Sequence, residues 1–369
     1  MERSGTRGGL VRISLRSIRA TRSWAPAVSE REAVEARPPR ATAVLFGHGE
    51  AEGALLAAYR GGRLPHAWLV GGPNGIGKAT LAYRMARFIL AHPDPGAAQV
   101  AAAASLAVGP DHPVARRMAA QAQGDLLVLE RTINEKTGKL RQDIQVDDVR
   151  RAVTFFGSTA GEGGWRVAIV DSVDELNREG ANALLKVLEE PPWRALLLLV
   201  SHSAARVLPT IRSRCRLIAL RPLAVADVAG AAAAAIGESP ESPDILAAAA
   251  VAGGCVGRAL AFLDGDALDL RKAIMDALDR LPAVDPRALH ALGDRLSGAE
   301  AAPLKAFVDT VNGWLSGRLS AGTPDRTRLA RVAEAWDKIN AAARDVEEYN
   351  LERKPLVFNV FGWLSEAVG

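Results

Sequence analysis

The chain has 369 residues, 49% of them hydrophobic and 24% charged, and its formal net charge at pH 7 is +4. This length predicts two or three domains, and no apolar run reaches the roughly 18 residues that a membrane-spanning helix requires. The two cysteines, Cys215 and Cys255, are far apart in the sequence, which argues against a disulfide framework or a zinc module and favours a protein of a reducing cytoplasm.

The N-terminal segment is basic. Residues 1–23 carry six Arg against one Glu, a local charge of +5 that leaves −1 for the remainder. The rest of the chain therefore lacks the charge of a protein dominated by a nucleic-acid-binding surface. We interpret residues 1–40 as a disordered extension, or as the result of a start codon assigned too far upstream. A transit-like or nucleic-acid-contacting tail is the alternative.

The first functional motif is GPNGIGKAT at residues 72–80. It matches the phosphate-binding pattern GxxxxGK[ST], in which backbone N–H groups close around a phosphate and the lysine neutralises its charge. The hydroxyl that would hold Mg²⁺ is replaced by the methyl group of Ala79. We therefore expect weak ATP binding, with Mg²⁺ bound only together with the nucleotide. The residues predicted to bind nucleotide here are Gly72, Gly75, Gly77, Lys78 and Thr80.

The surroundings of this motif support a phosphate-binding loop. An apolar run at residues 66–70 precedes it, and residues 80–90 follow with the spacing of an amphipathic helix. A strand, a glycine loop and a helix are the context that such a loop requires. A loop that uses glycine only for a tight turn between two core elements is the alternative.

The next part of the chain alternates between strands and helices. Residues 92–123 are rich in Ala, Pro and His and predict an insertion with one helix around 114–122. Strands are then expected at 126–129, 166–171 and 195–200, and helices at 145–156 and from about 181 to Pro191. This alternation predicts an α/β domain whose parallel sheet is covered on both faces.

Asp171 ends the second of these strands, where a carboxylate can support Mg²⁺ opposite the phosphate loop. In an active ATPase of this type the next residue is a glutamate that activates water, but here it is Ser172, whose hydroxyl is a poor base near neutral pH. Asp174 and Glu175 are interpreted as caps of the following helix. Their use as a substitute base is the alternative.

The sequence changes character after residue 223. Ala-rich segments at 227–236, 245–251 and 257–263 predict short helices, and every periodic segment beyond residue 268 is helical. We therefore divide the folded chain into an α/β nucleotide domain at 41–222, a small helical domain at 223–265 and a second helical domain at 266–369. Trp314, Trp336 and Trp363 in the last domain suggest a role in assembly rather than chemistry.

Three motifs in order carry a family resemblance. The runs NALLKVLEEPP at 182–192, LVSHS at 199–203 and LPTIRSRC at 208–215 closely resemble the AAA+ clamp-loader subunits of bacterial DNA polymerase III, and the similarity continues through RPL at 221–223. The resemblance covers most of residues 42–223. It implies an AAA+ P-loop domain with a parallel sheet, followed by a small helical lid domain and an all-α C-terminal collar domain for oligomerisation.

The resemblance also implies roles for single residues. Arg214, in Ser-Arg-Cys, corresponds to the arginine finger that acts in trans on the ATP of a neighbouring subunit; a surface Arg is the alternative. Ser201 corresponds to a sensor of the γ-phosphate or is an ordinary strand-end Ser. Arg258 corresponds to a second sensor in the small domain or is a solvated charge. The four-cysteine zinc module of many members is absent, and His92 and His112 alone cannot form a tetrahedral site.

Ala79 and Ser172 make the resemblance closest to the stator type of subunit, which keeps the finger but has lost hydrolytic residues. Such a chain would join the gamma/tau-type motor subunits and the delta subunit, and would reach the sliding clamp and primed DNA through the complex, without a membrane. The rival hypothesis is an active motor-type ATPase, in which Thr80 supplies the metal hydroxyl and Asp174 or Glu175 the base. Another AAA+ protein, such as a helicase loader, would not explain Ser-Arg-Cys together with LEEPP.

Overall fold

The computed structural model describes residues 36–133, 141, 143–157, 164–204, 206–263, 267–298, 301–320 and 326–368. All elements below belong to the compact unit formed by residues 33–369. The extension predicted for residues 1–40 lies outside the described residues, except for 36–40. The boundary predicted at residue 265 also falls outside them.

A five-stranded parallel sheet forms the centre of the first domain, in the order β2-β3-β4-β1-β5. The strands are β1 (Ala67–Gly71), β2 (Leu126–Glu130), β3 (Arg166–Asp171), β4 (Ala195–Ser201) and β5 (Arg216–Ala219). The pairing sets Gly71 beside Ser201 and Asp171 beside Val200 and Glu130. The ends of β1, β3 and β4 that carry the predicted site residues therefore meet at one edge, where ligands of such sheets bind.

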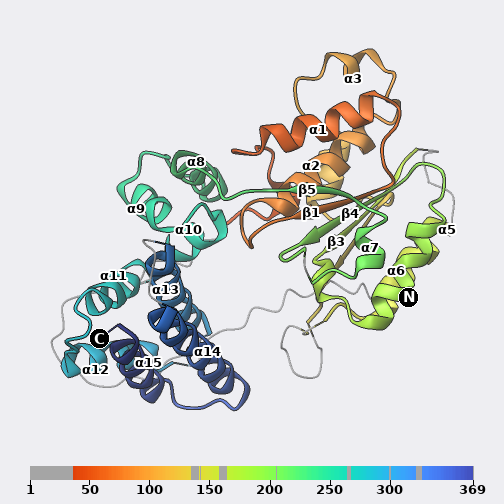
Figure 1. Cartoon of the computed structure of the whole chain (residues 1–369). Coiled ribbons are helices and arrows are strands. Elements are labelled where there is room, and N and C mark those ends of the chain that lie inside the picture. The colour runs from red at the N-terminus through yellow and green to blue at the C-terminus, as the bar shows by residue number, and fades with distance from the viewer. Residues whose placement is uncertain are drawn as a thin grey trace, which may run out of the picture. The chain divides into compact units, whose positions relative to one another are not determined.

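Both faces of the sheet are buried, as predicted. Along β1, Trp68 and Val70 point into one core, while Ala67 and Leu69 point into the other. This alternation follows from the two-residue period of a strand. The helices that cover the first face are α1 (Gly49–Arg60), α2 (Lys78–Ala91), α3 (Ala98–Ala102) and α4 (Pro113–Ala119). The second face is covered by α5 (Val146–Gly157), α6 (Arg178–Glu189) and α7 (Pro209–Arg212), as Figure 1 shows.

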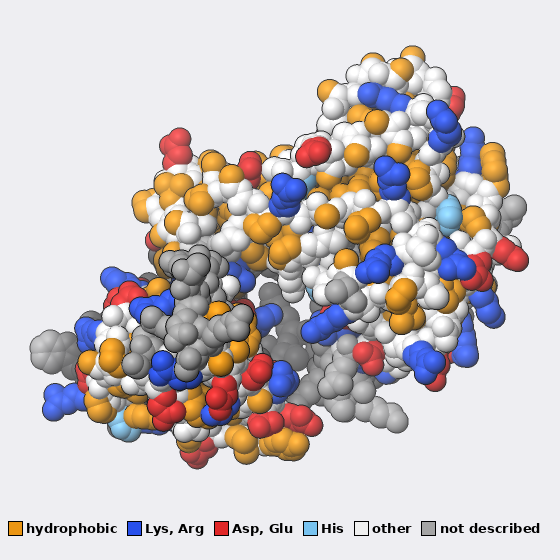
Figure 2. All heavy atoms as spheres, in the orientation of Figure 1, with side chains coloured by type: hydrophobic (Ala, Val, Ile, Leu, Met, Phe, Trp, Pro, Cys, Tyr) orange, Lys and Arg blue, Asp and Glu red, His pale blue; other side chains and the backbone are white. Residues whose placement is uncertain are grey.

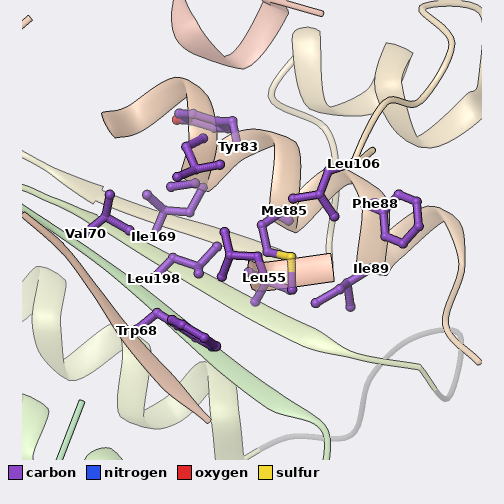
Figure 3. Packing of buried hydrophobic residues seen from close by; sticks show 14 of the residues in the cluster. Leu55, Trp68, Val70, Tyr83, Met85, Phe88, Ile89, Leu106, Ile169 and Leu198 are labelled. Atoms are coloured by element: carbon purple, nitrogen blue, oxygen red, sulfur yellow. The ribbon is translucent and has the colours of Figure 1, made fainter. Parts of the chain in front are cut away.

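The first core joins segments that are distant in the sequence. Figure 3 shows Leu55 of α1 and Met85 of α2 close to Ile169 of β3 and Leu198 of β4. Leu106, from the segment predicted to be an insertion, is fully buried in the same cluster. The segment is thus part of the core, and its predicted helix is present as α4.

Local signals define the ends of several helices. Asn177 caps α6 by accepting a hydrogen bond from Gly180 N at 2.7 Å, and the helix ends before Pro191. Pro209 occupies the first turn of α7, where its missing N–H costs nothing. The elements without a counterpart in the sequence-based expectations are η1 (Pro39–Ala41), α1, α3, η2 (Val173–Glu175), α7 and the edge strand β5.

The second helical group follows the sheet closely in sequence. It consists of α8 (Val225–Ile236), α9 (Pro243–Val251) and α10 (Val256–Leu263), which we call the lid. These bounds agree with the three predicted short helices to within two residues. Small side chains fill its core, including Ala232, Ala248 and Ala259, which are fully buried. Such residues let short helices pack closely.

The remaining helices form the collar. They are α11 (Ala267–Leu278), α12 (Pro286–Leu296), α13 (Ala301–Ser320), α14 (Arg326–Glu348) and α15 (Arg353–Val368). Their apolar faces share one core, which includes the buried Trp314, with Trp336 and Trp363 packed against it. These tryptophans therefore stabilise the bundle itself, with Trp314 buried and the other two only partly so. In Figure 2, acidic and basic side chains are interspersed on the visible face of the collar helices.

Candidate functional site

The phosphate-binding loop connects β1 to α2 in a conformation that requires glycine. Gly72 and Gly75 have φ values of 149° and 74°, which other residues rarely adopt. A Cβ atom on Gly72 would lie 2.7 Å from the carbonyl oxygen of Leu220, and one on Gly75 would lie 2.8 Å from Cys255 Sγ. Backbone geometry and close packing together therefore exclude side chains at both positions.

Lys78, the first residue of α2, turns its ammonium group onto its own loop. Its Nζ donates to the carbonyl oxygens of Gly72 at 2.8 Å and Pro73 at 2.6 Å. Burial lowers the pKa of Lys78, while the carboxylates of Asp171 and Asp174 oppose this shift. The amine must leave these carbonyl groups, or share its protons with them, to neutralise a phosphate.

Three groups from outside the loop hold its carbonyl oxygens. The Cys255 thiol donates to Asn74 O at 3.0 Å, and the Gly257 N–H donates to Gly75 O at 2.9 Å. His48 Nε2 donates to Ile76 O at 2.7 Å. Two of these donors belong to the start of α10, so the lid is bonded directly to the phosphate loop.

A cavity of about 310 Å³ lies between the phosphate loop, the lid and the segment before α1. Of the predicted nucleotide-binding residues, Gly75, Gly77, Lys78, Thr80 and Asp171 line it. Its apolar wall comes mainly from residues 44–46 and from the lid, including Ala231, Ala234 and Leu260. A cavity with one apolar wall and a lysine at a glycine loop suits a ligand with a flat apolar part and a phosphate.

Asp171 reaches this cavity from the end of β3. Burial raises the pKa of its carboxyl group, and the neighbouring carboxylate of Glu130 raises it further, against the opposing effect of Lys78. Glu130 is the residue paired with Asp171 in the sheet. The donor set for a metal ion is weak here, because Ala79 has no oxygen atom to offer beside this carboxylate.

The two acidic residues after Ser172 do not cap the next helix, which corrects the expectation from the sequence. Asn177 supplies that cap. Asp174 instead accepts hydrogen bonds from the backbone N–H groups of His202, at 2.8 Å, and Ser203, at 3.1 Å. Glu175 pairs with Arg131 at 2.8 Å. Both carboxylates therefore bind donors that are distant in the sequence and make no cap contact with α6.

These contacts make Asp174 a poor substitute for the missing glutamate, whereas burial raises the pKa of Glu175 and only its position counts against it. Burial alone would raise the pKa of Asp174, but the hydrogen bonds donated to its carboxylate, led by that from His202 N, outweigh burial and lower that pKa. A carboxylate with a lowered pKa is a weaker base. Neither Asp174 nor Glu175 is among the residues that line the cavity.

Ser201 and Arg258 lie close to the site without lining the cavity. Ser201 is fully buried at the end of β4, directly before the cavity residue His202. Arg258 is on the exposed side of α10, where its Nη1 lies 3.5 Å from Ala252 O. The structure thus brings Gly75, Gly77, Lys78, Thr80 and Asp171 together around the cavity, whereas Gly72, Ser201 and Arg258 do not line it.

Arg214 lies on the opposite side of the sheet from α2, in the turn after α7. Its Nη1 donates to Thr210 O at 2.9 Å and its Nη2 to Glu189 Oε1 at 2.8 Å. Its side chain is 36% exposed. The guanidinium group is therefore fixed by its own chain and still reachable by a partner. Burial raises the pKa of the neighbouring Cys215 to about 12, so this thiol stays protonated.

Four residues near these sites were given no role from the sequence, namely His48, His202, Cys255 and Glu189. His202 and Glu189 belong to the motifs LVSHS and NALLKVLEEPP, so their positions were an available signal. His48 and Cys255 contact loop residues far along the chain, and no local pattern marks them. In the described part of the chain, no group of three His, Cys, Asp or Glu side chains is arranged to hold a metal ion. No helix described there is long and apolar enough to cross a membrane.

Residues 47–224 match a family model described as DNA polymerase III, delta subunit. The DNA polymerase III subunit delta′ of Pseudomonas aeruginosa is 40% identical over 159 residues, which are 42% of this chain and 43% of that protein. The subunit delta′ of Escherichia coli is 30% identical over 229 residues, 61% of this chain and 62% of that protein. The chain therefore spans less than two thirds of the length of either relative.

Among solved structures, a DNA polymerase III gamma subunit-related protein from Thermotoga maritima is similar over 85% of this chain and 99% of its own. The two share 17% sequence identity, with a TM-score of 0.41.

Proposed function

We propose that the chain is the stator of a DNA polymerase III clamp loader, because residues 47–224 match the family model described as DNA polymerase III, delta subunit, and the two relatives of 40% and 30% identity are delta′ subunits. In this role it joins gamma/tau-type motor subunits and a delta subunit, so that the sliding clamp is opened and placed on primed DNA. Its contact with clamp and DNA is made through the complex.

One observation carries the proposal. Within the single segment that matches the family, the Ser-Arg-Cys arginine is retained while two groups needed for hydrolysis are replaced, by Ala79 and Ser172. A subunit with this combination serves a neighbour's active site rather than its own. Phosphoryl transfer builds negative charge on the transferred group, and an arginine supplied in trans stabilises that charge. Arg214, exposed and held by two acceptors, suits such a role.

The chain's own hydrolysis of ATP is lost in this proposal. Ala79 cannot ligate Mg²⁺, and Ser172 is a buried hydroxyl that cannot take a proton from water near neutral pH. The rival motor-type reading has one point in its favour, since Thr80 lines the cavity. It lacks a base, because the carboxylates of Asp174 and Glu175 are engaged with His202, Ser203 and Arg131.

ATP would bind weakly if at all. The loop glycines and Lys78 fit a phosphate, and the apolar wall fits a base, so the residues suit a nucleotide better than they suit its metal ion. Bound ATP would require Lys78 to give up bonds to Gly72 O and Pro73 O. This competition lowers the affinity.

Reconstitution tests the stator function. The tagged chain is mixed with gamma/tau-type and delta subunits, and the purified assembly is assayed for ATPase and for clamp loading on primed DNA. We expect a stable complex whose DNA-stimulated ATPase and loading both fall when this chain is left out. Failure of the chain to join the complex, or full activity without it, would reject the proposal.

A further inference from the structure

The ion pair between Glu189 and Arg214 joins two family motifs that lie 25 positions apart in the sequence. Glu189 is the last residue of α6 and belongs to the LEEPP run, whereas Arg214 belongs to Ser-Arg-Cys. The Arg214 Nη2 to Glu189 Oε1 distance is 2.8 Å. This contact connects the LEEPP run to the arginine that is proposed to act on the neighbouring subunit's ATP.

The backbone at both ends of the pair is rigid. Leu188, next to Glu189, is 2% exposed, and Ile211, three residues before Arg214, is 1% exposed. Both side chains belong to the same core on the second face of the sheet. The C-terminal end of α6 is further defined by Pro191, which cannot continue the helix. The separation of the two backbones is therefore set by the fold and not by the ion pair.

The guanidinium group is held from two directions. Thr210 O accepts from Nη1 at 2.9 Å, and the Glu189 carboxylate accepts from Nη2. A guanidinium group has five N–H donors, so other donors remain for a ligand on its exposed side. The side chains of Arg214 and Glu189 are 36% and 51% exposed, which leaves the pair within reach of a partner subunit.

A long arginine side chain that is free in solution must be ordered before it can stabilise charge in a transition state. A donor that is already oriented avoids this cost at the moment of reaction. Glu189 could instead compete with the phosphate for the same guanidinium group. Water screens a pair as exposed as this one, so a phosphate can attract the guanidinium group without a large penalty. The two acceptors, Thr210 O and Glu189 Oε1, together still restrict the plane of that group.

We propose that Glu189 is a positioning residue for Arg214, orienting its guanidinium group toward the nucleotide of the neighbouring subunit. This inference rests on the proposed function of Arg214. Glu189 makes no contact with the nucleotide, so it acts on the turnover of the neighbour's site and not on how tightly that site binds ATP.

The test uses the reconstituted loader with clamp and primed DNA, and compares wild type with Glu189→Ala, Glu189→Gln, Arg214→Ala and the double variant Glu189→Ala/Arg214→Ala. Glu190→Ala is the matched control, since Glu190 is an exposed neighbour in the same run. Assembly and thermal unfolding are measured for each variant. The kcat and the KM for ATP are determined separately, because loss of an interaction made only in the transition state lowers kcat.

We expect Glu189→Ala to lower kcat at the neighbour's site about two- to fivefold, with KM unchanged. The ATPase lost is then about half to four fifths of the ATPase that Arg214→Ala removes. Glu189→Gln, which keeps an acceptor oxygen, should retain most of that activity, and Glu190→Ala should match wild type. The double variant should equal Arg214→Ala, because a residue that acts only through Arg214 has no effect in its absence.

Two kinds of failure are distinguishable. The positioning role is wrong if Arg214→Ala lowers kcat while Glu189→Ala leaves kcat unchanged or raises it. It is also wrong if the double variant is less active than Arg214→Ala. In both cases the proposed role of Arg214 stands. Wild-type ATPase and loading in Arg214→Ala itself would remove the proposed function and this inference together.

Discussion

The Gly257 backbone N–H donates to the carbonyl oxygen of Gly75 at 2.9 Å, which bonds the first turn of α10 to the middle of the phosphate-binding loop. The Cys255 thiol adds a second bond to this loop at Asn74 O. The lid and the loop are therefore one structural unit, and a substitution in one of them should alter the stability of the other.

A methyl group at Gly75 should disrupt the contact between the phosphate-binding loop and the lid. In Gly75→Ala the new Cβ would lie 2.8 Å from Cys255 Sγ and 3.1 Å from Gly257 Cα, at a φ of +74°. The positive φ costs about 1 kcal/mol, and the collision adds about 1–3 kcal/mol. The control is Gly62→Ala, which has a φ of +65° and no neighbouring atom within 4 Å. Chemical denaturation should show the larger loss for Gly75→Ala; equal losses would mean that the lid contact contributes nothing.

The isolated chain should not hydrolyse ATP. Ala79 offers no oxygen to Mg²⁺ and Ser172 no base to water, so we expect turnover far below the roughly 1 per second of ordinary enzymes. A coupled ATPase assay of the purified chain, repeated with primed DNA, measures this. Turnover at an ordinary rate would favour the motor-type reading instead.

ATP binding should depend on Lys78 and on pH. A charge-assisted contact of this lysine with phosphate predicts that Lys78→Ala weakens binding about tenfold, as measured by calorimetric titration. Burial lowers the pKa of Lys78 from its ordinary 10.5, so the charged form is lost at a lower pH than for a free lysine. Wild-type affinity should therefore fall as pH rises toward that range, while the affinity of Lys78→Ala should not. Identical heats for both proteins would show that the loop has only a structural role.

Arg214→Ala should lower the DNA-stimulated ATPase of the reconstituted loader without affecting assembly. The loss should be partial, because the other sites draw their arginines from different subunits, while clamp loading falls further if the sites fire in order. Stability should change by about 1 kcal/mol or less, as for other exposed ion pairs. Arg212→Ala and Arg216→Ala control for the loss of surface charge. Similar behaviour of all three variants would contradict a specific role for Arg214.

The collar should hold the complex together. Its five helices share a core distinct from those of the sheet and the lid. Removing residues beyond about 265 should therefore leave the cores of the sheet intact, and among the described residues it takes from the lid core the contacts made by Ala267, Leu268 and Arg271. We expect the shortened chain to lose co-purification with the motor and delta subunits. Circular dichroism of the shortened chain checks that it remains folded, and recovery of the full complex with it would overturn this assignment.

The sequence by itself determined the elements whose signals are local. Apolar runs marked β1, β3 and β4, helical spacing marked α2, α5 and α6, and glycine and proline marked the loop and helix ends, because backbone conformation responds to neighbouring residues. Three motifs in the same order were sufficient to predict the family resemblance. Helix α1 was missed because its sequence, rich in Gly and Ala, carries a weak periodic signal.

Tertiary structure alone decided which side chains meet. Asp174 was expected to cap the helix beside it, but the N–H groups at the end of β4 are better donors for it, and sheet pairing brings them there. Glu189 meets Arg214, and Cys255 meets Asn74 across 181 positions. Such contacts arise only when a shared core fixes distant backbones side by side, so no window of sequence contains the information that specifies them.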